Sequence, residues 1–467
     1  MFSEKAYNSL DKKKLKEYNK IRNKSRRSRF CQAPFSTLFF SEYGEILPCY
    51  YNKSIVFGNS DTSFEEAWFS PQMEKLREHI IHNDLSFGCQ DCKFYFDLEN
   101  YYSVGAWKYD YLPVNKSRYP VSLDFQISNI CNLSCIMCNG ELSQTVRKNR
   151  EKKEVFKNPY DNSIIKKITP FLPHLKEAAF TGGEVFLIKL YYDIWDKIIE
   201  VNPSIRVSIT TNGTILNSRV KSYLEKLDFN ITISIDSVNK ENFEKIRRFS
   251  DFETVIKNLD YYKDYTQRKG TNFTVKICPM RQNWHEIPEI INFLNNKNIS
   301  FLFNNVIFPP YTSLWNLPSI ELKEIADFID KPDYKGQSAT NKTNIKRVKN
   351  LVSQLKNWQK ASLEIETNYP DLKNKTSKEL YELIITSVNN FKNSFPDISN
   401  KDEYGFEIEK IFDAIFDKIT DEETLRNALI FYFKMPVHRL ISEFNIRNTD
   451  KIIDRTMQSG LTEPAPI

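Results

Sequence analysis

The chain has 467 residues, 40% of them hydrophobic and 14% aromatic, which is enough to build the cores of about two to four domains. Its formal net charge of +6 is small for this length and does not by itself indicate a polyanionic partner. No apolar run reaches the length of a membrane span and the N-terminus lacks the apolar stretch of a signal peptide, so we expect a cytoplasmic protein. In that setting its eight cysteines are expected to be metal ligands rather than disulfides.

The first 30 residues carry a dense basic run, from Lys12 to Arg29. Such a run is either a solvated helix or frayed end, which is the commoner case, or an arm that contacts an acidic partner. We expect residues 1–30 to form a basic N-terminal arm.

Four cysteines follow, namely Cys31, Cys49, Cys89 and Cys92. Gly44 precedes a short strand-like run before Cys49, and a glycine there favours a tight hairpin turn that directs the first two cysteines towards one point. The run from Ser63 predicts a helix with Glu66 at the capping-box position. Four thiolates can saturate an iron–sulfur cluster or hold a structural zinc ion, and the spacing alone leaves both open.

Residues 93–117 are rich in tyrosine and phenylalanine and connect this cysteine set to the next. They could stack on a substrate, but aromatic linkers more often pack against a neighbouring domain. We expect them to complete a small α+β domain over residues 31–117.

A second cysteine group, Cys131-Asn-Leu-Ser-Cys135-Ile-Met-Cys138, follows directly on a strand-like run. Thiolates are soft ligands, and a short loop can wrap three of them around one face of a [4Fe–4S] cube. No fourth cysteine or histidine is near, so one iron of such a cube stays open to a ligand that is not protein. A closed structural zinc site has four ligands, so three argue against zinc here.

Strand-like and helix-like runs alternate over residues 118–315. The expected strands are 121–128, 177–181, 205–211, 230–236, 273–279 and 300–306. This alternation predicts parallel pairing through right-handed crossovers, and six such units form a partial (β/α)6 barrel. The carboxyl ends of its strands are expected to form the reactive face.

Ordered motifs at successive strand ends resemble the radical S-adenosylmethionine (SAM) enzymes over about residues 118–310. They are the three-cysteine loop, Thr181-Gly182-Gly183-Glu184, Thr210-Thr211-Asn212-Gly213 and Ile233-Ser234-Ile235-Asp236. The resemblance implies that Cys131, Cys135 and Cys138 hold a [4Fe–4S] cluster whose open iron is chelated by SAM. It also implies a flavodoxin- or ferredoxin-like electron donor, reductive cleavage of SAM to a 5′-deoxyadenosyl radical, and hydrogen-atom abstraction from a substrate.

The same resemblance implies a SAM pocket along the strand ends. Gly182 and Gly183 would let the backbone approach the methionine amino group. Ser234 and Asp236 share one side of their strand and would offer oxygens to the ribose. Arg247, in preference to Arg248, would pair with the SAM carboxylate. The implied cofactor-binding residues are Met137, which replaces the family's usual aromatic residue, Gly182, Gly183, Glu184, Asn212, Ser234, Asp236 and Arg247.

The N-terminal cysteine set resembles the twitch domain, the shortened form of the SPASM domain that carries an auxiliary cluster in many radical SAM enzymes. This resemblance implies that Cys31, Cys49, Cys89 and Cys92 saturate a second [4Fe–4S] cluster, with a role in electron transfer or in shaping the site. The domain stands before the barrel here, whereas the family more often places it afterwards.

Cys278, on the fifth expected barrel strand, belongs to neither cysteine set. It is the candidate catalytic residue, as a hydrogen-atom donor to a substrate radical of the kind that some epimerase-like radical enzymes use. The more frequent role of such a cysteine is that of a small buried apolar residue.

Residues 316–467 are polar, poor in glycine and helical in pattern. Capping boxes begin at Thr376 and Thr420. Apolar residues recur at helical spacing and predict a buried stripe, namely Ile408, Ile411, Phe412, Ile415, Phe416 and Ile419. We expect an all-helical domain that grips a partner, caps the barrel or only packs.

The sequence thus predicts a radical SAM enzyme with two clusters. A peptide or protein is the expected substrate, because the helical domain and basic arm leave room for a large partner. One alternative is a dehydrogenase or epimerase of a small molecule such as a sugar or aminoglycoside. An alternative from another class is a zinc-scaffolded nucleic-acid-binding protein, although the charge makes nucleic acid a weaker expectation.

Overall fold

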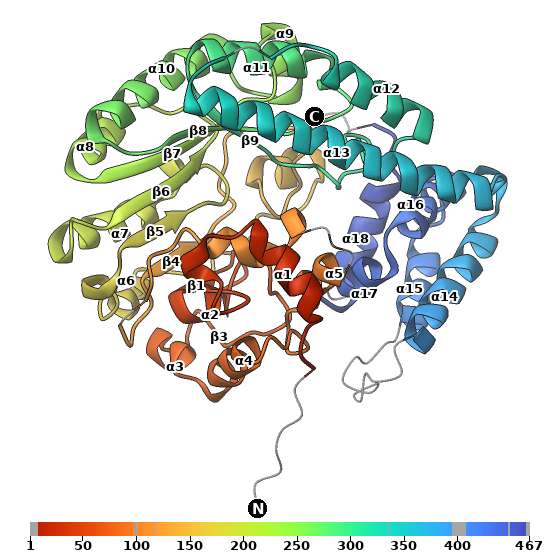
Figure 1. Cartoon of the computed structure of the whole chain (residues 1–467), viewed down its shortest axis with the longest axis horizontal. Coiled ribbons are helices and arrows are strands. Elements are labelled where there is room, and N and C mark those ends of the chain that lie inside the picture. The colour runs from red at the N-terminus through yellow and green to blue at the C-terminus, as the bar shows by residue number, and fades with distance from the viewer. Residues whose placement is uncertain are drawn as a thin grey trace, which may run out of the picture.

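The computed structural model describes residues 8–97, 99, 101–115, 117–334, 336–394, 408–446 and 449–463. One curved sheet organises them, with nine strands in the order β3-β2-β1-β4-β5-β6-β7-β8-β9 within this described part (Figure 1). The strands are β1 (Thr37–Phe40), β2 (Glu45–Leu47), β3 (Gly58–Asn59), β4 (Ser122–Phe125), β5 (Glu177–Phe180), β6 (Arg206–Thr211), β7 (Asp228–Ser234), β8 (Phe273–Ile277) and β9 (Ser300–Phe303).

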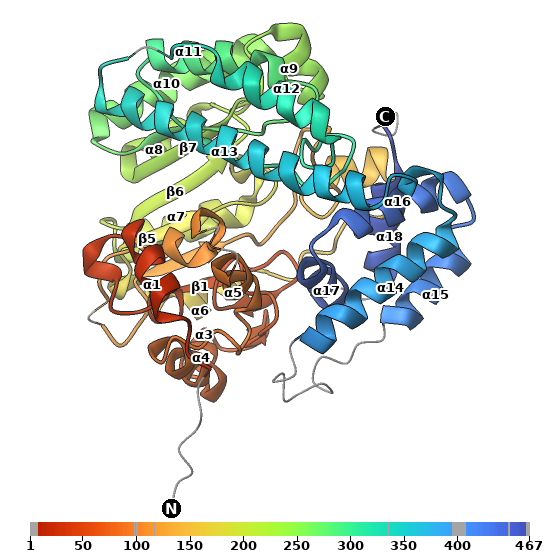
Figure 2. The same ribbon diagram turned by 45° about the vertical axis from the view of Figure 1, so that its right-hand side comes forward.

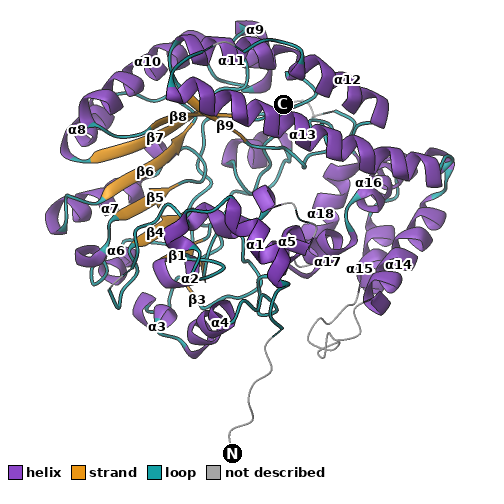
Figure 3. Ribbon diagram, viewed as in Figure 1, coloured by secondary structure: helices purple, strands orange, loops and turns teal. Residues whose placement is uncertain are grey.

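Strands β4 to β9 all pair in parallel, which confirms the predicted α/β fold class with its parallel sheet. Helices cover the outer side of this sheet, because alternate strand residues such as Val207 and Ile209 are buried there. Figure 3 shows these helices outside the strands. They are α6 (Ser163–Ile168), α7 (Lys189–Val201), α8 (Ser218–Lys226), α9 (Lys240–Ile246), α10 (Phe252–Lys269) and α11 (Ile287–Asn296).

The N-terminal hairpin extends the barrel sheet. Strand β1 runs parallel to β4, with Phe40 opposite Phe125, and antiparallel to β2. Gly44 makes the turn with φ of +84°, as the hairpin prediction requires. Short helices complete this region, namely α2 (Ala33–Ser36), α3 (Phe64–Trp68), α4 (Pro71–Ile81) and α5 (Gln90–Asp97). Residues 31–117 therefore share their sheet with the barrel.

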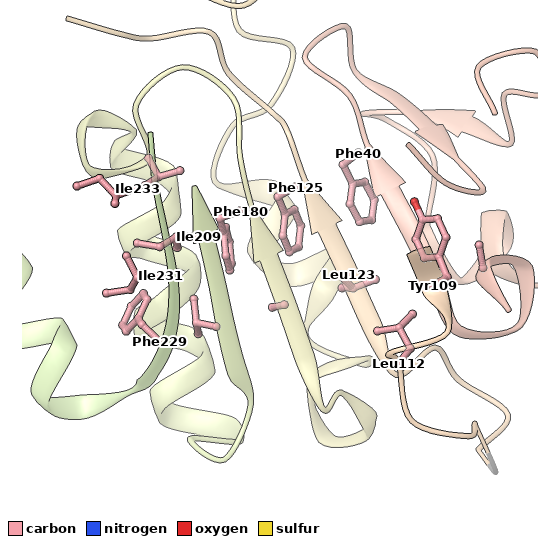
Figure 4. Packing of buried hydrophobic residues seen from close by; sticks show 14 of the residues in the cluster. Phe40, Tyr109, Leu112, Leu123, Phe125, Phe180, Ile209, Phe229, Ile231 and Ile233 are labelled. Carbon is pink, nitrogen blue, oxygen red and sulfur yellow. The ribbon is translucent and has the colours of Figure 1, made fainter. Parts of the chain in front are cut away.

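Stacked aromatic rings join the two regions in one core. The Phe125 ring lies 5.1 Å from that of Phe40 and 5.0 Å from that of Phe180, with interplanar angles of 12° and 19°. Figure 4 shows the three rings side by side on neighbouring strands. The hairpin and the barrel are thus packed as one unit on this face of the sheet.

The expectation that residues 1–30 form a basic arm is wrong for its described part, because most of that part is packed against the rest of the protein. Helix α1 (Lys12–Lys20) starts at Asp11, whose side chain accepts a hydrogen bond from Lys14 N at 2.8 Å. Tyr18 is fully buried, and Arg22 forks onto the two Asp110 oxygens at 2.8 Å each. A buried bidentate ion pair fixes this segment against the aromatic linker. Residues 1–7 of the expected arm lie outside the described residues.

The predicted boundary at residue 316 is also corrected. Helix α12 (Ser319–Asp330) and the first half of α13 (Ala339–Asn368) bury Leu322, Leu351 and Leu355 in the barrel core. A second core begins only at Leu372. At 1.5 Å per residue, the 30 residues of α13 span about 45 Å, so one helix links both cores.

The second core is the predicted all-helical domain. It contains α14 (Ser377–Ser394), α15 (Ile408–Lys418), α16 (Glu422–Lys434), α17 (Val437–Ile446) and α18 (Thr449–Gly460). The capping box at Thr376 forms, since Thr376 N donates to Glu379 Oε2 at 2.8 Å and Glu379 N donates to Thr376 Oγ1 at 3.3 Å. At the other predicted start the N-cap is Asp421 rather than Thr420, because Asp421 accepts the bond from Thr424 N. Of the predicted apolar stripe, Ile408, Phe412, Ile415 and Ile419 are buried in this core, and Ile411 and Phe416 pack against it while partly exposed.

This helical domain lies against both cysteine regions (Figure 2). From α17, Arg439 Nη1 pairs with Asp91 Oδ2 at 3.0 Å on α5, between Cys89 and Cys92. From α18, Asp454 Oδ2 pairs with Lys153 Nζ at 2.6 Å, in the segment that follows the second cysteine group. Within the part of the chain that the structure describes, no helix is long and apolar enough to cross a membrane.

We predict that Phe125→Ala lowers the free energy of unfolding by about 3–5 kcal/mol, because it removes a buried ring stacked on both sides. The matched control is Phe328→Ala, whose ring is 41% exposed, with an expected loss of about 1 kcal/mol or less. Urea unfolding followed by circular dichroism measures both, and equal losses in the two variants would contradict the shared aromatic core.

Candidate functional site

The three-cysteine loop follows β4 at the carboxyl edge of the sheet, with residues 126–130 between Phe125, where the strand ends, and Cys131. Ser134 N donates to Arg248 O at 3.1 Å and Ile136 N donates to Ile246 O at 2.9 Å. These main-chain bonds fix the loop alongside the end of α9, so its shape does not depend on side chains alone.

The three thiols of this loop lie close enough to repel one another when ionised. Burial and the neighbouring Cys135 raise the pKa of Cys131 to about 12. The pKa of Cys138 is raised by burial and by Cys135 and Cys131. Buried thiols that disfavour each other's ionisation form a donor set that is completed by a cation, which deprotonates them on binding. The residues present therefore fit a cluster at this loop.

The glycine pair after β5 is required by the backbone of this loop. Gly182 and Gly183 have φ of +84° and +44°. A Cβ atom at Gly182 would lie 2.6 Å from Ser128 O, and one at Gly183 would lie 2.0 Å from Ile130 O. The two glycines thus admit the close approach of the segment that leads into the cysteines, while their approach to the SAM amino group stays a prediction.

Glu184 joins the ends of β5 and β6. Its buried carboxylate accepts hydrogen bonds from Thr211 Oγ1 at 2.8 Å and from Asn212 N at 2.7 Å. Burial raises the pKa of Glu184, while the bonds from Asn212 and Thr211 lower it. Asn212 Nδ2 in turn lies 3.9 Å from Cys131 Sγ. Glu184 thereby holds Asn212 beside the cysteine loop.

Asp236 differs from the expectation that it faces the ribose. It is fully buried, and its Oδ2 pairs with Arg247 Nη2 at 2.6 Å. Its Oδ1 accepts a hydrogen bond from Cys278 N at 2.7 Å. Because protein groups engage both oxygens, Asp236 orients Arg247 and the end of β8. Ser234 is the last residue of β7, two residues before Asp236, and is partly exposed.

The side chain of Arg247 extends to the cysteine loop. Its Nη1 lies 4.0 Å from Cys135 Sγ. Its Nε is buried and, among the described residues, has no hydrogen-bond partner. An orphaned buried donor beside a thiol fits a site whose remaining acceptor comes from a bound group.

Cys278 lies beside the loop in a small apolar cluster with Ile136, Ile246, Met280 and Val306, against which Met137 packs. The thiol is buried, and burial together with the Asp236 carboxylate raises the pKa of Cys278 to about 12. It is therefore protonated near neutral pH. A protonated thiol is compatible both with hydrogen-atom donation and with simple packing.

The other four cysteines line one small apolar pocket. Burial and neighbouring thiols raise the pKa of Cys92 to about 12, and those of Cys31 and Cys89 well above their usual value. Burial raises the pKa of Cys49 to about 11. All eight cysteines of the chain are free thiols. The four therefore fit a second cluster-binding group.

Donors of the surrounding chain already point at these sulfurs. Ala33 N donates to Cys31 Sγ at 3.4 Å and Asn52 N donates to Cys49 Sγ at 3.3 Å. Asn52 Nδ2 also lies 3.7 Å from Cys89 Sγ. Hydrogen bonds to thiolate sulfur stabilise iron–sulfur clusters and tune their potentials. Across the described ranges, no three side chains of His, Cys, Asp or Glu are close enough together to hold a single metal ion.

Sequence reasoning did not identify Asn52 or Arg150. Asn52 follows Cys49 by three residues, a position that no local pattern marks. Arg150 donates from Nη1 to Cys135 O at 3.1 Å, yet in the sequence it stands in the basic run from Arg147 to Lys153 like its neighbours. Only the path of the chain distinguishes it.

Two family models match the chain. Residues 125–294 match the radical SAM superfamily, and residues 31–93 match an iron–sulfur cluster-binding domain, the SPASM domain. The first match contains the three-cysteine loop and the second contains the other four cysteines. The two domains imply a SAM-binding [4Fe–4S] cluster with SAM and an auxiliary iron–sulfur cluster.

Among curated relatives, the probable GTP 3′,8-cyclase of Methanocaldococcus jannaschii is 27% identical over 213 residues, which are 44% of this chain and 67% of that protein. The GTP 3′,8-cyclase of Vibrio parahaemolyticus is 25% identical over 185 residues, 39% of this chain and 52% of that protein. The chain thus spans about half to two thirds of these relatives.

Two solved structures are similar in fold. The structure of anSMEcpe with bound AdoMet is 17% identical and the match covers 45% of this chain and 58% of that chain, with a TM-score of 0.35. That of Streptococcus suis SuiB bound to S-adenosylmethionine is 17% identical and covers 66% and 73%, with a TM-score of 0.33.

Each cysteine set lies in a matched iron–sulfur domain, on a parallel α/β sheet whose strand ends carry the radical SAM motifs. The chain is a radical SAM enzyme with a twitch/SPASM-like domain ahead of its core.

Proposed function

We propose that this enzyme modifies a peptide or protein, with SAM and a [4Fe–4S] cluster at Cys131, Cys135 and Cys138 and an auxiliary [4Fe–4S] cluster at Cys31, Cys49, Cys89 and Cys92. Bound there, the cofactors supply reductive cleavage of SAM and hydrogen-atom abstraction from the substrate. The residues of the chain bind and orient these groups and exclude water from them.

The observation that carries this proposal is the contact of the helical domain with both cysteine regions. Arg439 pairs with Asp91 beside the auxiliary cysteines, and Asp454 pairs with Lys153 beyond the other loop. A domain with its own core is thus added beside the reactive edge of the barrel. Such an added surface suits a long, chain-like substrate better than a small molecule.

A lysine on the inner face of the sheet favours a substrate that carries an acidic group. Lys276 lies opposite Ser234 and Leu302 on neighbouring strands, on the face away from the buried Val275 and Ile277. Burial lowers the pKa of Lys276. Among the described residues its side-chain ammonium has no ion-pair or hydrogen-bond partner, so a substrate carboxylate near the SAM site would complete it.

A nucleotide is the second candidate substrate, because the curated relatives are GTP 3′,8-cyclases. Those matches cover only part of each relative, and a phosphate would complement Lys276 as a carboxylate does. The zinc-scaffolded alternative loses support, since both cysteine sets lie in iron–sulfur domains.

Deuterium transfer into 5′-deoxyadenosine separates the two substrates. Anaerobic enzyme, SAM and reductant are incubated with a deuterated peptide encoded beside the gene for this chain, or with deuterated GTP. The proposal expects 5′-deoxyadenosine that is one mass unit heavier with the peptide and a mass change in that peptide. Label transferred only from GTP would establish the nucleotide alternative.

We predict that Cys89→Ala and Cys92→Ala abolish the modified product but leave measurable SAM cleavage, because each removes one ligand of the auxiliary cluster only. Chromatography quantifies 5′-deoxyadenosine and product in the same samples. Cys135→Ala is the contrasting control, with both products expected to be lost. Full product formation by the auxiliary variants would contradict the assigned role.

We predict that Cys278→Ala keeps 5′-deoxyadenosine formation, since the thiol packs in an apolar cluster outside both cysteine sets. If Cys278 donates a hydrogen atom to the substrate radical, product formation falls at least about 100-fold in this variant. Unchanged turnover would assign Cys278 to the core.

A further inference from the structure

Three backbone carbonyls in the second half of the three-cysteine loop converge on one buried side chain, Arg150. Its Nη1 donates to Cys135 O at 3.1 Å and lies 3.5 Å from Ile136 O. Its Nη2 donates to Cys138 O. Only 9% of Arg150 is exposed. The guanidinium fork therefore fixes the main chain at two of the three proposed cluster ligands.

Arg150 belongs to a segment whose side chains donate hydrogen bonds to main-chain carbonyls along this loop. Ser143 Oγ donates to Leu133 O at 2.8 Å and Thr145 Oγ1 donates to Cys131 O at 2.5 Å. The short π-helical turn η4 (Val146–Arg150) then brings Arg150 beneath the other half of the loop. On this one segment, Thr145 and Arg150 thus bind the carbonyls of all three cysteines, and Ser143 binds that of Leu133 between them.

The charge of Arg150 has no carboxylate to balance it. Within the described part of the chain it forms no ion pair, whereas Arg247 on the other side of Cys135 is paired with Asp236. Because the guanidinium is bonded to Cys135 O and Cys138 O, this positive charge lies beside both of these cysteines. A buried, unbalanced cation is costly unless an anionic group occupies the site beside it.

We propose that Arg150 is a positioning residue for the SAM-binding cluster, holding Cys135 and Cys138 in place through its fork and favouring the reduced cluster through its charge. This inference rests on the proposed binding of a cluster by Cys131, Cys135 and Cys138. A cluster with three thiolate ligands is anionic and gains negative charge on reduction, so a nearby buried cation raises its reduction potential.

Two variants separate the charge from the fork. Arg150→Gln removes both, and Arg150→Lys keeps the charge but not the planar fork. The matched control is Arg147→Gln on the same turn, which loses the same charge from a side chain that lies over the Phe156 ring at 3.9 Å. Two measurements are followed by electron paramagnetic resonance, namely a reductive titration and the loss of cluster signal as iron is released to a chelator. Both are read from the signal that added SAM perturbs, which distinguishes this cluster from the auxiliary one.

We predict that Arg150→Gln shifts the midpoint potential of that signal to more negative values and speeds iron release about 10- to 100-fold. Arg150→Lys is expected to speed iron release while its potential stays close to that of the unchanged enzyme, and Arg147→Gln is expected to change neither. If Arg150→Gln does not fold, unaltered iron release from Arg150→Lys overturns the proposal.

An unaltered potential and unaltered iron release in Arg150→Gln also overturn it. This failure is distinct from failure of the proposed function, in which the unchanged enzyme shows no cluster signal that responds to SAM. Cys135→Ala supplies the reference for that second outcome, since it removes a proposed ligand rather than its support.

Discussion

The structure depends on one electrostatic constraint, which is that buried thiols are gathered in two groups where their thiolates repel one another. Burial raises the pKa of Cys131 and of Cys92 to about 12, and neighbouring thiols contribute to both. A protein gains nothing for its own stability from such groups, because apolar residues would fill the same space at lower cost. Their arrangement is explained by the positive iron–sulfur cores that the two matched domains bind.

The fold serves this constraint by bringing both groups to one sheet. Strand β1 pairs with β4, so the hairpin between Cys31 and Cys49 and the loop that starts at Cys131 extend from neighbouring strands. The aromatic stack through Phe125 makes that junction a core rather than a hinge. Helix α13 then leads from the barrel core to the helical domain, which returns to contact both groups.

The parallel sheet, the helical domain and the cysteine sets were predictable because each leaves a local signal, such as the alternation of Val207 and Ile209 or the Thr376 capping box. Contacts between segments that are distant in the sequence leave no such local signal. The pairing of Arg22 with Asp110 turns the expected arm into packed structure, although the residues are 88 positions apart. The expected strand 230–236 ends at Ser234, so Asp236 lies just beyond it, and its ion pair with Arg247 is not revealed by period-two alternation.

The segment after Cys138 links the cluster loop to the helical domain. Arg150 holds the loop on one side, and the next residue, Glu151, accepts hydrogen bonds from Gly140 N at 2.7 Å and from Gln458 Nε2 of α18 at 3.3 Å. Lys153 adds the ion pair to Asp454. A shift of α18 would therefore act on the segment that presents Arg150. Because potential and ligand geometry respond to such supporting groups, the helical domain is connected to the cluster through the contacts of a few consecutive residues.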